Sequence, residues 1–334
     1  MNSVYLLSAG VAIGLIYSYL AAPKPPAPNN TKDARTTIHH TPLHQFHHPP
    51  PRSKKRRKLR FDISFDGTNY SGWQYHPNTA LPALYTVVTA AWVQATGESG
   101  FGPVATRLDA GVSANQQICS VRTQHNWTPE QLQHVLINMN HALPKDIRCL
   151  LVKKVPIKFH AINVAKWKRY GYVVSTSESR GSTAQRCWYR AGKDIDVQLT
   201  LKALSTFIGC HDFRRFTKDD GPWASDDERE GKTSLGKSAK RSIYAVTAIK
   251  REDGAVHLTV QGNGFMKHMV RRLVGVAVGV GAGELSVADV LVALGRDEEK
   301  WTTTHTQLSK AWRCFEAPAN GLTLEEIGVD GRFE

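Results

Sequence analysis

One short segment of the sequence has residue types suited to catalysis. In the stretch from residue 106 to residue 117, TRLDAGVSANQQ, Asp109 stands two residues after Arg107 and directly before Ala110 and Gly111. The two small residues leave room for a ligand or another backbone to come into contact. A carboxylate beside a basic residue on such a loop is suited to remain ionised next to a substrate. Asp109 is therefore a candidate catalytic residue, although turn chemistry alone also explains an Asp-Ala-Gly sequence.

The elements around this loop are expected to hold Asp109 in place. Apolar and polar residues alternate over residues 59–65, which predicts a half-buried strand. Residues 118–121 predict a second strand that leaves the Asp109 loop, so that Asp109 lies at the mouth of a sheet. Between the two strands, residues 84–96 have few helix breakers and an apolar face, which predicts a helix.

The rest of the body alternates between helices and strands. Thr128 as N-cap and Pro129 at the first helical position begin one helix, and Ser286 caps another that Gly295 closes. This alternation, without long parallel βαβ signatures, predicts an α+β fold with a mainly antiparallel sheet. Further strands are predicted over residues 147–155, 167–176, 242–250 and 256–261, further helices over residues 199–208 and 265–280, and a loop over residues 218–240.

Charge is unevenly distributed along the chain of 334 residues, whose formal net charge is +14. Residues 1–58 hold nine Lys and Arg against one Asp, a charge of +8, which leaves +6 for the rest. A body with that surplus is compatible with binding a polyanion, although an incidentally basic protein has the same balance. The length suits two domains or one large one.

The cysteines give no sign of a disulfide framework or a zinc site. Their number is odd and none forms a Cys-x-x-Cys pair, so neither a disulfide scaffold nor a cysteine metal site is expected. We expect no metal. The five are Cys119, Cys149, Cys187, Cys210 and Cys314.

Residues 1–58 are expected to lie outside the fold. Residues 3–22 are uncharged and mostly apolar, which fits a membrane anchor, a cleaved presequence or a mispredicted start. Eight of the 16 prolines come before residue 52, and with several histidines they predict an extended linker. The basic cluster at residues 53–60, SKKRRKLR, fits a nuclear address, an RNA-touching arm, a positive flank of the apolar segment or a solvated charge run. The compartment therefore stays open between an organelle, a membrane and the nucleus.

Eight short motifs stand out along residues 59–330. They are GWQ at residues 72–74, RLDAGV at 107–112, NHALPKDI at 140–147, FHA at 159–161, RYGY at 169–172, DFRRF at 212–216, GNGFMKHMVRRLVG at 262–275 and APANGLTL at 317–324. Through these motifs and their order the body resembles the tRNA pseudouridine synthase A (TruA) family, and chance rarely produces eight motifs in order.

The resemblance implies a cofactor-free isomerase that acts on tRNA, with the anticodon arm at positions 38–40 as the expected target. It breaks the C1′–N1 bond of a uridine, turns the freed base and rejoins it through C5. The fold it implies has two α+β halves with a basic cleft between them, residues 59–160 and residues 161–330. A homodimer is also implied, and residues 3–22, if retained, would add membrane association. The alternative is a non-catalytic RNA-binding or RNA-chaperone protein on the same fold.

The resemblance also implies roles for single residues. Asp109 matches the catalytic aspartate, acting at the sugar as nucleophile or as base. Tyr170 matches a tyrosine that stacks on the flipped base, and Arg271 an arginine that pairs with the aspartate, holding it ionised and oriented. Arg107 matches a residue that fills the space left by the extruded base. The residues expected to contact RNA are Trp73, Gln74, Arg169 and His268, besides Arg107.

The chain departs from the family pattern around the aspartate. The usual sequence there is Gly-Arg-Thr-Asp-Ala-Gly-Val-His-Ala, whereas this chain has Thr106 for the glycine, Leu108 for the threonine and Ser113 for the histidine. Arg-Leu-Asp is the active triplet in another branch of pseudouridine synthases, so Leu108 is compatible with catalysis. The replacements at Thr106 and Ser113 are expected to affect the shape of the loop and which uridine is modified. Residues 223–240 look like an insertion.

Overall fold

A computed structural model describes residues 52–75, 79–175, 186–190, 194–218, 238–295 and 315–331. The predictions for residues 3–22, for the Pro- and His-rich linker and for most of the insertion lie outside these residues. Within them, no helix combines the length and apolar character needed to cross a bilayer.

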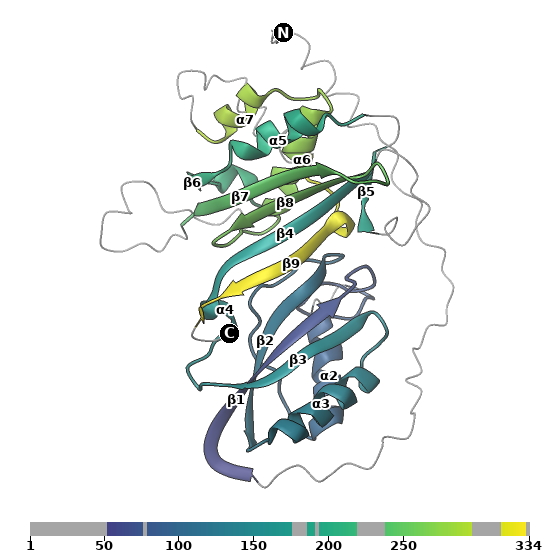
Figure 1. Cartoon of the computed structure of the whole chain (residues 1–334), viewed down its shortest axis with the longest axis vertical. Helices are drawn as coiled ribbons and strands as arrows, with labels where there is room; N and C mark the ends of the chain where they lie inside the picture. The colour runs from purple at the N-terminus through teal and green to yellow at the C-terminus, as the bar shows by residue number, and fades with distance from the viewer. Residues whose placement is uncertain are drawn as a thin grey trace, which may run out of the picture. The chain divides into compact units, whose positions relative to one another are not determined.

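The described strands form one sheet in the order β3-β1-β2-β9-β4-β8-β7-β6, and β5 pairs with β4 (Figure 1). Neighbouring strands pair in antiparallel fashion, except at the parallel β2–β9 and β4–β5 contacts. The predicted α+β class with a mainly antiparallel sheet is therefore confirmed. The strands are β1 (Arg52–Phe65), β2 (Ser113–His125), β3 (Ile147–Val155), β4 (Ala165–Ser175), β5 (Trp188–Tyr189), β6 (Gly209–Asp212), β7 (Lys240–Lys250), β8 (Val256–Gly262) and β9 (Leu322–Val329).

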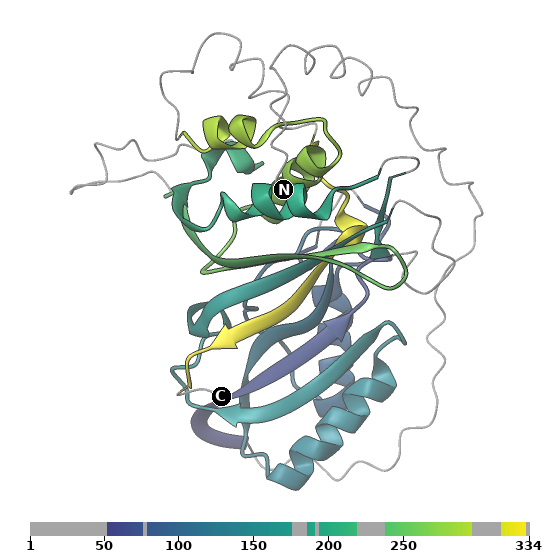
Figure 2. The ribbon, with the colours of Figure 1, turned by 45° about the horizontal axis from the view of Figure 1, so that its top comes forward.

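The helices lie in two groups, one beside each half of the sheet (Figures 1 and 2). One group covers β1, β2 and β3, where Phe61 of β1 packs edge-on against Trp92 at 5.3 Å between ring centroids. The other group covers β4, β7 and β8. The first group is α2 (Leu84–Thr96) and α3 (Pro129–Ala142), the second is α5 (Val197–Ser205), α6 (Met269–Gly281) and α7 (Val287–Ala293), and the short α4 (Ala161–Val164) leads into β4.

Local signals in the sequence placed several helix and strand ends correctly. The helix over residues 84–96 and the strand over residues 147–155 have the predicted bounds. Thr128 accepts a hydrogen bond from the backbone of Gln131, whose own side chain reaches back to the Thr128 backbone, so a capping box begins α3. The helix expected from residue 265 begins instead at Met269, because the preceding residues form a turn.

Strand β1 corrects the expected end of the linker. It begins at Arg52, before the predicted start at residue 59, and its basic end pairs with both neighbours: Lys58 lies opposite Arg122 of β2 and Val155 of β3. The Lys58 ammonium is buried and donates a hydrogen bond to the carbonyl of Phe159. The end of the basic cluster is thus part of the sheet, because its backbone completes the ladder and its charged side chain finds an acceptor.

The two halves of the sheet meet at a short parallel contact. Only Ser113 and Ala114 of β2 pair with β9, opposite Thr323 and Leu324. The segment that joins the halves therefore begins four residues after Asp109, and the predicted position of Asp109 at the mouth of a sheet is confirmed.

Candidate active site

The loop that carries Asp109 rests on the backbone of the GWQ segment. The amide of Trp73 donates to the carbonyl of Leu108 at 3.0 Å, and the amide of Gly111 donates to the carbonyl of Tyr70 at 3.3 Å. Gly72 has a φ of 95°, and a Cβ on it would lie 2.9 Å from the carbonyl carbon of Asp109. A glycine at this position therefore lets the two segments touch.

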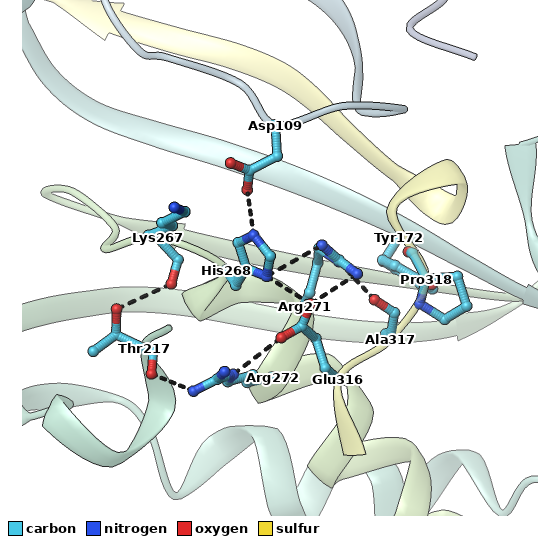
Figure 3. A network of polar contacts seen from close by, with 10 residues as sticks. All are labelled: Asp109, Tyr172, Thr217, Lys267, His268, Arg271, Arg272, Glu316, Ala317 and Pro318. Carbon is cyan, nitrogen blue, oxygen red and sulfur yellow. Dashed lines mark hydrogen bonds and ion pairs between the residues drawn. The ribbon is translucent and has the colours of Figure 1, made fainter. Parts of the chain in front are cut away.

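The Asp109 side chain is partly open to solvent and faces the start of α6. It is 34% exposed, and its Oδ2 lies 3.6 Å from Nε2 of His268 (Figure 3). His268 is the N-cap of α6, so the positive end of the helix dipole lies beside it. The expected RNA-contacting residue His268 is thus the side chain that the structure brings to the carboxylate.

Tyr170 lies on the buried side of the same site. Its hydroxyl is 3.4 Å from Oγ1 of Thr106, and its ring packs edge-on against Phe265 at 5.2 Å. Burial raises the pKa of Tyr170 to about 12. The hydrogen bond with Thr106 opposes this rise, and the negative charge of Asp109 adds to it. Tyr170 therefore remains a neutral phenol at physiological pH, which suits an aromatic surface for a base.

His268 has an unusual backbone conformation. With a φ of 59° it is the one non-glycine among the described residues whose φ is positive. His and Asn are among the few residue types that adopt this region, and such positions are held by surrounding contacts at functional sites. Here Nδ1 of the ring lies 2.6 Å from Oε1 of Glu316, and that contact fixes the ring.

Glu316 is the centre of a polar network that the sequence did not reveal. Besides His268 it contacts Nη2 of Arg271 at 2.9 Å and Nε of Arg272 at 3.2 Å (Figure 3). Burial opposes its ionisation, but the hydrogen bonds from His268 and Arg272 and the charges of Arg271 and His268 lower the pKa of Glu316 to about 2. Glu316 directly precedes the APANGLTL motif, and this adjacency is the one signal that could have pointed to it.

Arg271 does not pair with Asp109, and this part of the prediction is wrong. Its guanidinium binds Glu316 and donates from Nε to the carbonyl of Ala317 at 2.7 Å. Glu316, one residue before Ala317, pairs with Arg271 in place of Asp109. The residue that reaches Asp109 is His268, three positions before Arg271.

Trp73 and Gln74 have different surroundings. Trp73 is 3% exposed and its ring lies 6.3 Å from that of Phe65, so it packs in the core. Gln74 is exposed, and its Oε1 lies 3.5 Å from Nη1 of Arg107, which is also exposed. The structure thus brings Gln74 and Arg107 together beside the Asp109 loop.

Arg169 lies on the face of the sheet opposite Tyr170. Successive residues of a strand point to opposite faces, and Arg169 precedes Tyr170 directly on β4. Its guanidinium pairs with Glu325 at 3.4 Å and with Glu326 at 2.5 Å, both on β9. Arg169 therefore does not join the cluster around Asp109.

A prediction follows from the low pKa of Glu316. A carboxylate whose folded-state pKa is depressed from 4.5 to about 2 stabilises the fold above pH 4.5, and this contribution is lost as the pH falls toward 2. We expect Glu316→Gln to lower the free energy of unfolding by about 3 kcal/mol or less at pH 6, and by less at pH 3. Urea unfolding of both proteins at the two pH values measures this difference, and an equal difference at both would contradict the assignment.

Metal ligands do not gather at this site. In the parts of the chain that the structure describes, no group of three His, Cys, Asp or Glu side chains could hold a metal ion. Cys119, Cys149 and Cys187 are buried, and Cys314 lies outside the described residues.

Comparison with known proteins agrees with the motifs. A family model described as tRNA pseudouridine synthase matches residues 203–328. The chain is 30% identical over 273 residues to tRNA pseudouridine synthase A of Acetivibrio thermocellus, covering 81% of this chain and 99% of that protein. The chain belongs to the tRNA pseudouridine synthase A family. The protein of that name from Thermoanaerobacter sp. (strain X514) is 32% identical over the same length and the same shares.

The match to these tRNA pseudouridine synthase A proteins takes in most of this chain. The 273 matched residues cover nearly the whole of each relative, so the relatives have counterparts to both halves of the sheet. Among solved structures, the archaeal box H/ACA sRNP Nop10-Cbf5 complex has a chain that aligns at 10% identity and a TM-score of 0.28, over 78% of this chain and 61% of that one. So low a TM-score carries no argument about the site.

Proposed function

We propose that this protein isomerises uridine to pseudouridine in tRNA, in the anticodon arm at positions 38–40, with Asp109 as the catalytic carboxylate. The observation that carries the proposal is a partly exposed Asp109 on a loop where the two halves of the sheet join, facing His268 at 3.6 Å. Family membership supports tRNA as the substrate.

The reaction requires a carboxylate at the sugar. The C1′–N1 bond breaks, the base turns, C5 bonds to C1′, and the C5 proton is lost while N1 gains one, so that no oxidant or reductant is consumed. Asp109 acts either as a nucleophile on C1′ or as a base at the sugar. Both routes pass through developing positive charge at the sugar, which a carboxylate stabilises.

Neighbouring residues receive the rest of the nucleotide. A base in a helix is out of reach until it is turned out of the stack. Tyr170, buried beside Asp109 and neutral, supplies an aromatic surface for the extruded base. Arg107, exposed two residues from Asp109 and close to Gln74, is positioned to fill the space that the base leaves.

The proposal is tested with the full chain and transcribed tRNA. Pseudouridine is mapped by carbodiimide modification and primer extension, on transcripts with uridine at positions 38–40 and on matched transcripts with cytidine there. We expect a stop in the anticodon arm of the first set alone. Tight tRNA binding without product on any transcript would refute the enzyme and favour the non-catalytic RNA-binding alternative, and product elsewhere would refute the target. The homodimer and membrane association through residues 3–22 stay predictions.

Two exposed lysines beside His268 are expected to contact the RNA backbone. Lys267 directly precedes His268, and its carbonyl accepts a hydrogen bond from the amide of Lys218 at 3.1 Å. The backbones of the two lysines are therefore adjacent. In Figure 3 the Lys267 side chain extends to the side of His268 on which Asp109 lies. Such lysines contribute to affinity by neutralising phosphates and releasing counterions.

Replacing both lysines with alanine is therefore expected to weaken tRNA binding about tenfold and to reduce the slope of log K against log salt by about 1 to 2. The matched control is Lys202→Ala on α5. This helix packs against the far end of α6, where the backbone amide of Asp196 donates to the carbonyl of Gly281. Filter binding at several salt concentrations gives both quantities. An unchanged slope for the double variant would contradict the phosphate contacts.

A further inference from the structure

A chain of three side chains leads away from the candidate catalytic carboxylate. Oδ2 of Asp109 lies 3.6 Å from Nε2 of His268, and Nδ1 of the same ring lies 2.6 Å from Oε1 of Glu316 (Figure 3). The imidazole thus stands between two carboxylates, one on the loop before β2 and one before β9. Asp109 is the more open of the two carboxylates, with 34% of its side chain exposed against 18% for Glu316, which lies behind the ring.

We propose that Glu316 is a positioning residue of this enzyme, which acts through His268 to orient Asp109. The proposal rests on the proposed function and adds to it a residue that does not touch the substrate. In many enzymes a carboxylate orients a histidine that in turn contacts the reacting group. Here Glu316 is the orienting carboxylate, His268 the histidine and Asp109 the reacting group.

The contact with Glu316 decides which nitrogen of His268 carries a proton. Glu316 is ionised, since its pKa is about 2, and an ionised carboxylate only accepts hydrogen bonds. The proton therefore lies on Nδ1, and the ring presents Nε2 to Asp109. With a second proton on Nε2, the imidazolium faces Oδ2 of Asp109 at 3.6 Å, and this ion pair holds the carboxylate in one orientation.

Glu316 is itself held in place from several sides. Arg271 and Arg272 bind its two oxygens, and Arg272 also donates to the carbonyl of Thr217. The next residue exchanges two hydrogen bonds with Arg271, because the Ala317 amide donates to the Arg271 carbonyl at 3.1 Å and Arg271 Nε donates to the Ala317 carbonyl. The network is thus rigid enough for Glu316 to fix a ring.

The close approach of this segment to α6 depends on a glycine. A Cβ on Gly275 would overlap the carbonyl oxygen of Phe315, the residue before Glu316. At the other end, the hydroxyl of Tyr172 donates to the carbonyl of Pro318 at 2.7 Å. The residues on both sides of Glu316 are therefore fixed, and the segment brings its carboxylate to the first turn of α6.

The test is a double-mutant cycle between Glu316 and His268 in the full chain. Glu316→Gln keeps the shape and removes the charge, and His268→Asn keeps a residue type that tolerates the φ of 59°. We expect Glu316→Gln to lower kcat for pseudouridine formation about 10- to 100-fold, with KM for tRNA nearly unchanged. In the His268→Asn background, Glu316→Gln should have no further effect on kcat.

A matched control is available on the other face of the sheet. Glu325 also contacts a histidine and an arginine, with His257 Nε2 at 2.9 Å and Arg169 Nε at 3.4 Å, but away from Asp109. Glu325→Gln should leave kcat near that of the wild type, although it breaks the same kinds of contact.

Two results would overturn the proposal. One is a wild-type kcat for Glu316→Gln. The other is a full additional loss of kcat when Glu316→Gln is added to His268→Asn, which would mean that Glu316 does not act through His268. A wild-type protein that makes no pseudouridine would refute the proposed function instead, so the two failures are distinguishable.

Discussion

Replacing Asp109 with asparagine is expected to abolish pseudouridine formation while tRNA binding persists. Asparagine has nearly the same size and shape, so the loop held by Trp73 and Gly111 keeps its hydrogen bonds. It lacks the negative charge that both proposed routes require at the sugar. Losses of about 10⁴-fold or more are typical when a nucleophile or its partner is removed, and we expect a loss of that size here.

The measurement combines single-turnover product formation with a binding assay on the same transcripts. Asp253→Asn is a suitable control, because Asp253 lies in the hairpin between β7 and β8 and pairs with Arg251 at 3.1 Å, remote from the loop. It should be fully active. Pseudouridine made at the wild-type rate by Asp109→Asn would remove Asp109 from the chemistry, and a loss of binding equal to the loss of rate would show that the residue serves recognition alone.

The features that the sequence predicted well depend on neighbours along the chain. The bounds of α2 and β3 and the capping box at Thr128 follow from periodicity and local hydrogen bonding, which five or ten residues determine. The position of Asp109 at the start of a strand follows in the same way. The separation of Arg169 from the Asp109 cluster follows in the same way, because Arg169 and Tyr170 are adjacent on a strand and point to opposite faces.

The features that the sequence did not predict depend on residues far apart in the chain. By charge alone, Arg271 could pair with either Asp109 or Glu316. It pairs with Glu316 because the segment before β9 brings that carboxylate to α6. Nothing in the type or spacing of Glu316 indicates that it meets a histidine 48 residues earlier. A core position is the commoner role for a tryptophan such as Trp73, but its type also suits contact with a base, and the packing near Phe65 comes from the fold.

The second large effect is expected at Gly72, whose backbone lies against the Asp109 loop. We expect Gly72→Ala to lower kcat about 100-fold or more, because displacing a reacting group by about 1 Å costs rate of that order. Its Cβ would lie 2.7 Å from the carbonyl oxygen of Leu108 and 2.9 Å from the carbonyl carbon of Asp109. These are backbone atoms and cannot turn aside as a side chain can, so the Asp109 loop itself must shift.

Gly97→Ala separates this effect from backbone strain. Gly97 also has a positive φ, 70°, but a Cβ there would meet no atom within 4 Å. Both variants therefore incur the cost of a left-handed alanine, roughly 1–2 kcal/mol of stability, and only Gly72→Ala displaces Asp109. Kinetics and urea unfolding of the pair distinguish the two contributions. Equal activity in the two variants would mean that the loop finds its position without the support of Gly72, whereas a selective loss of kcat in Gly72→Ala would show that the GWQ segment positions the catalytic carboxylate.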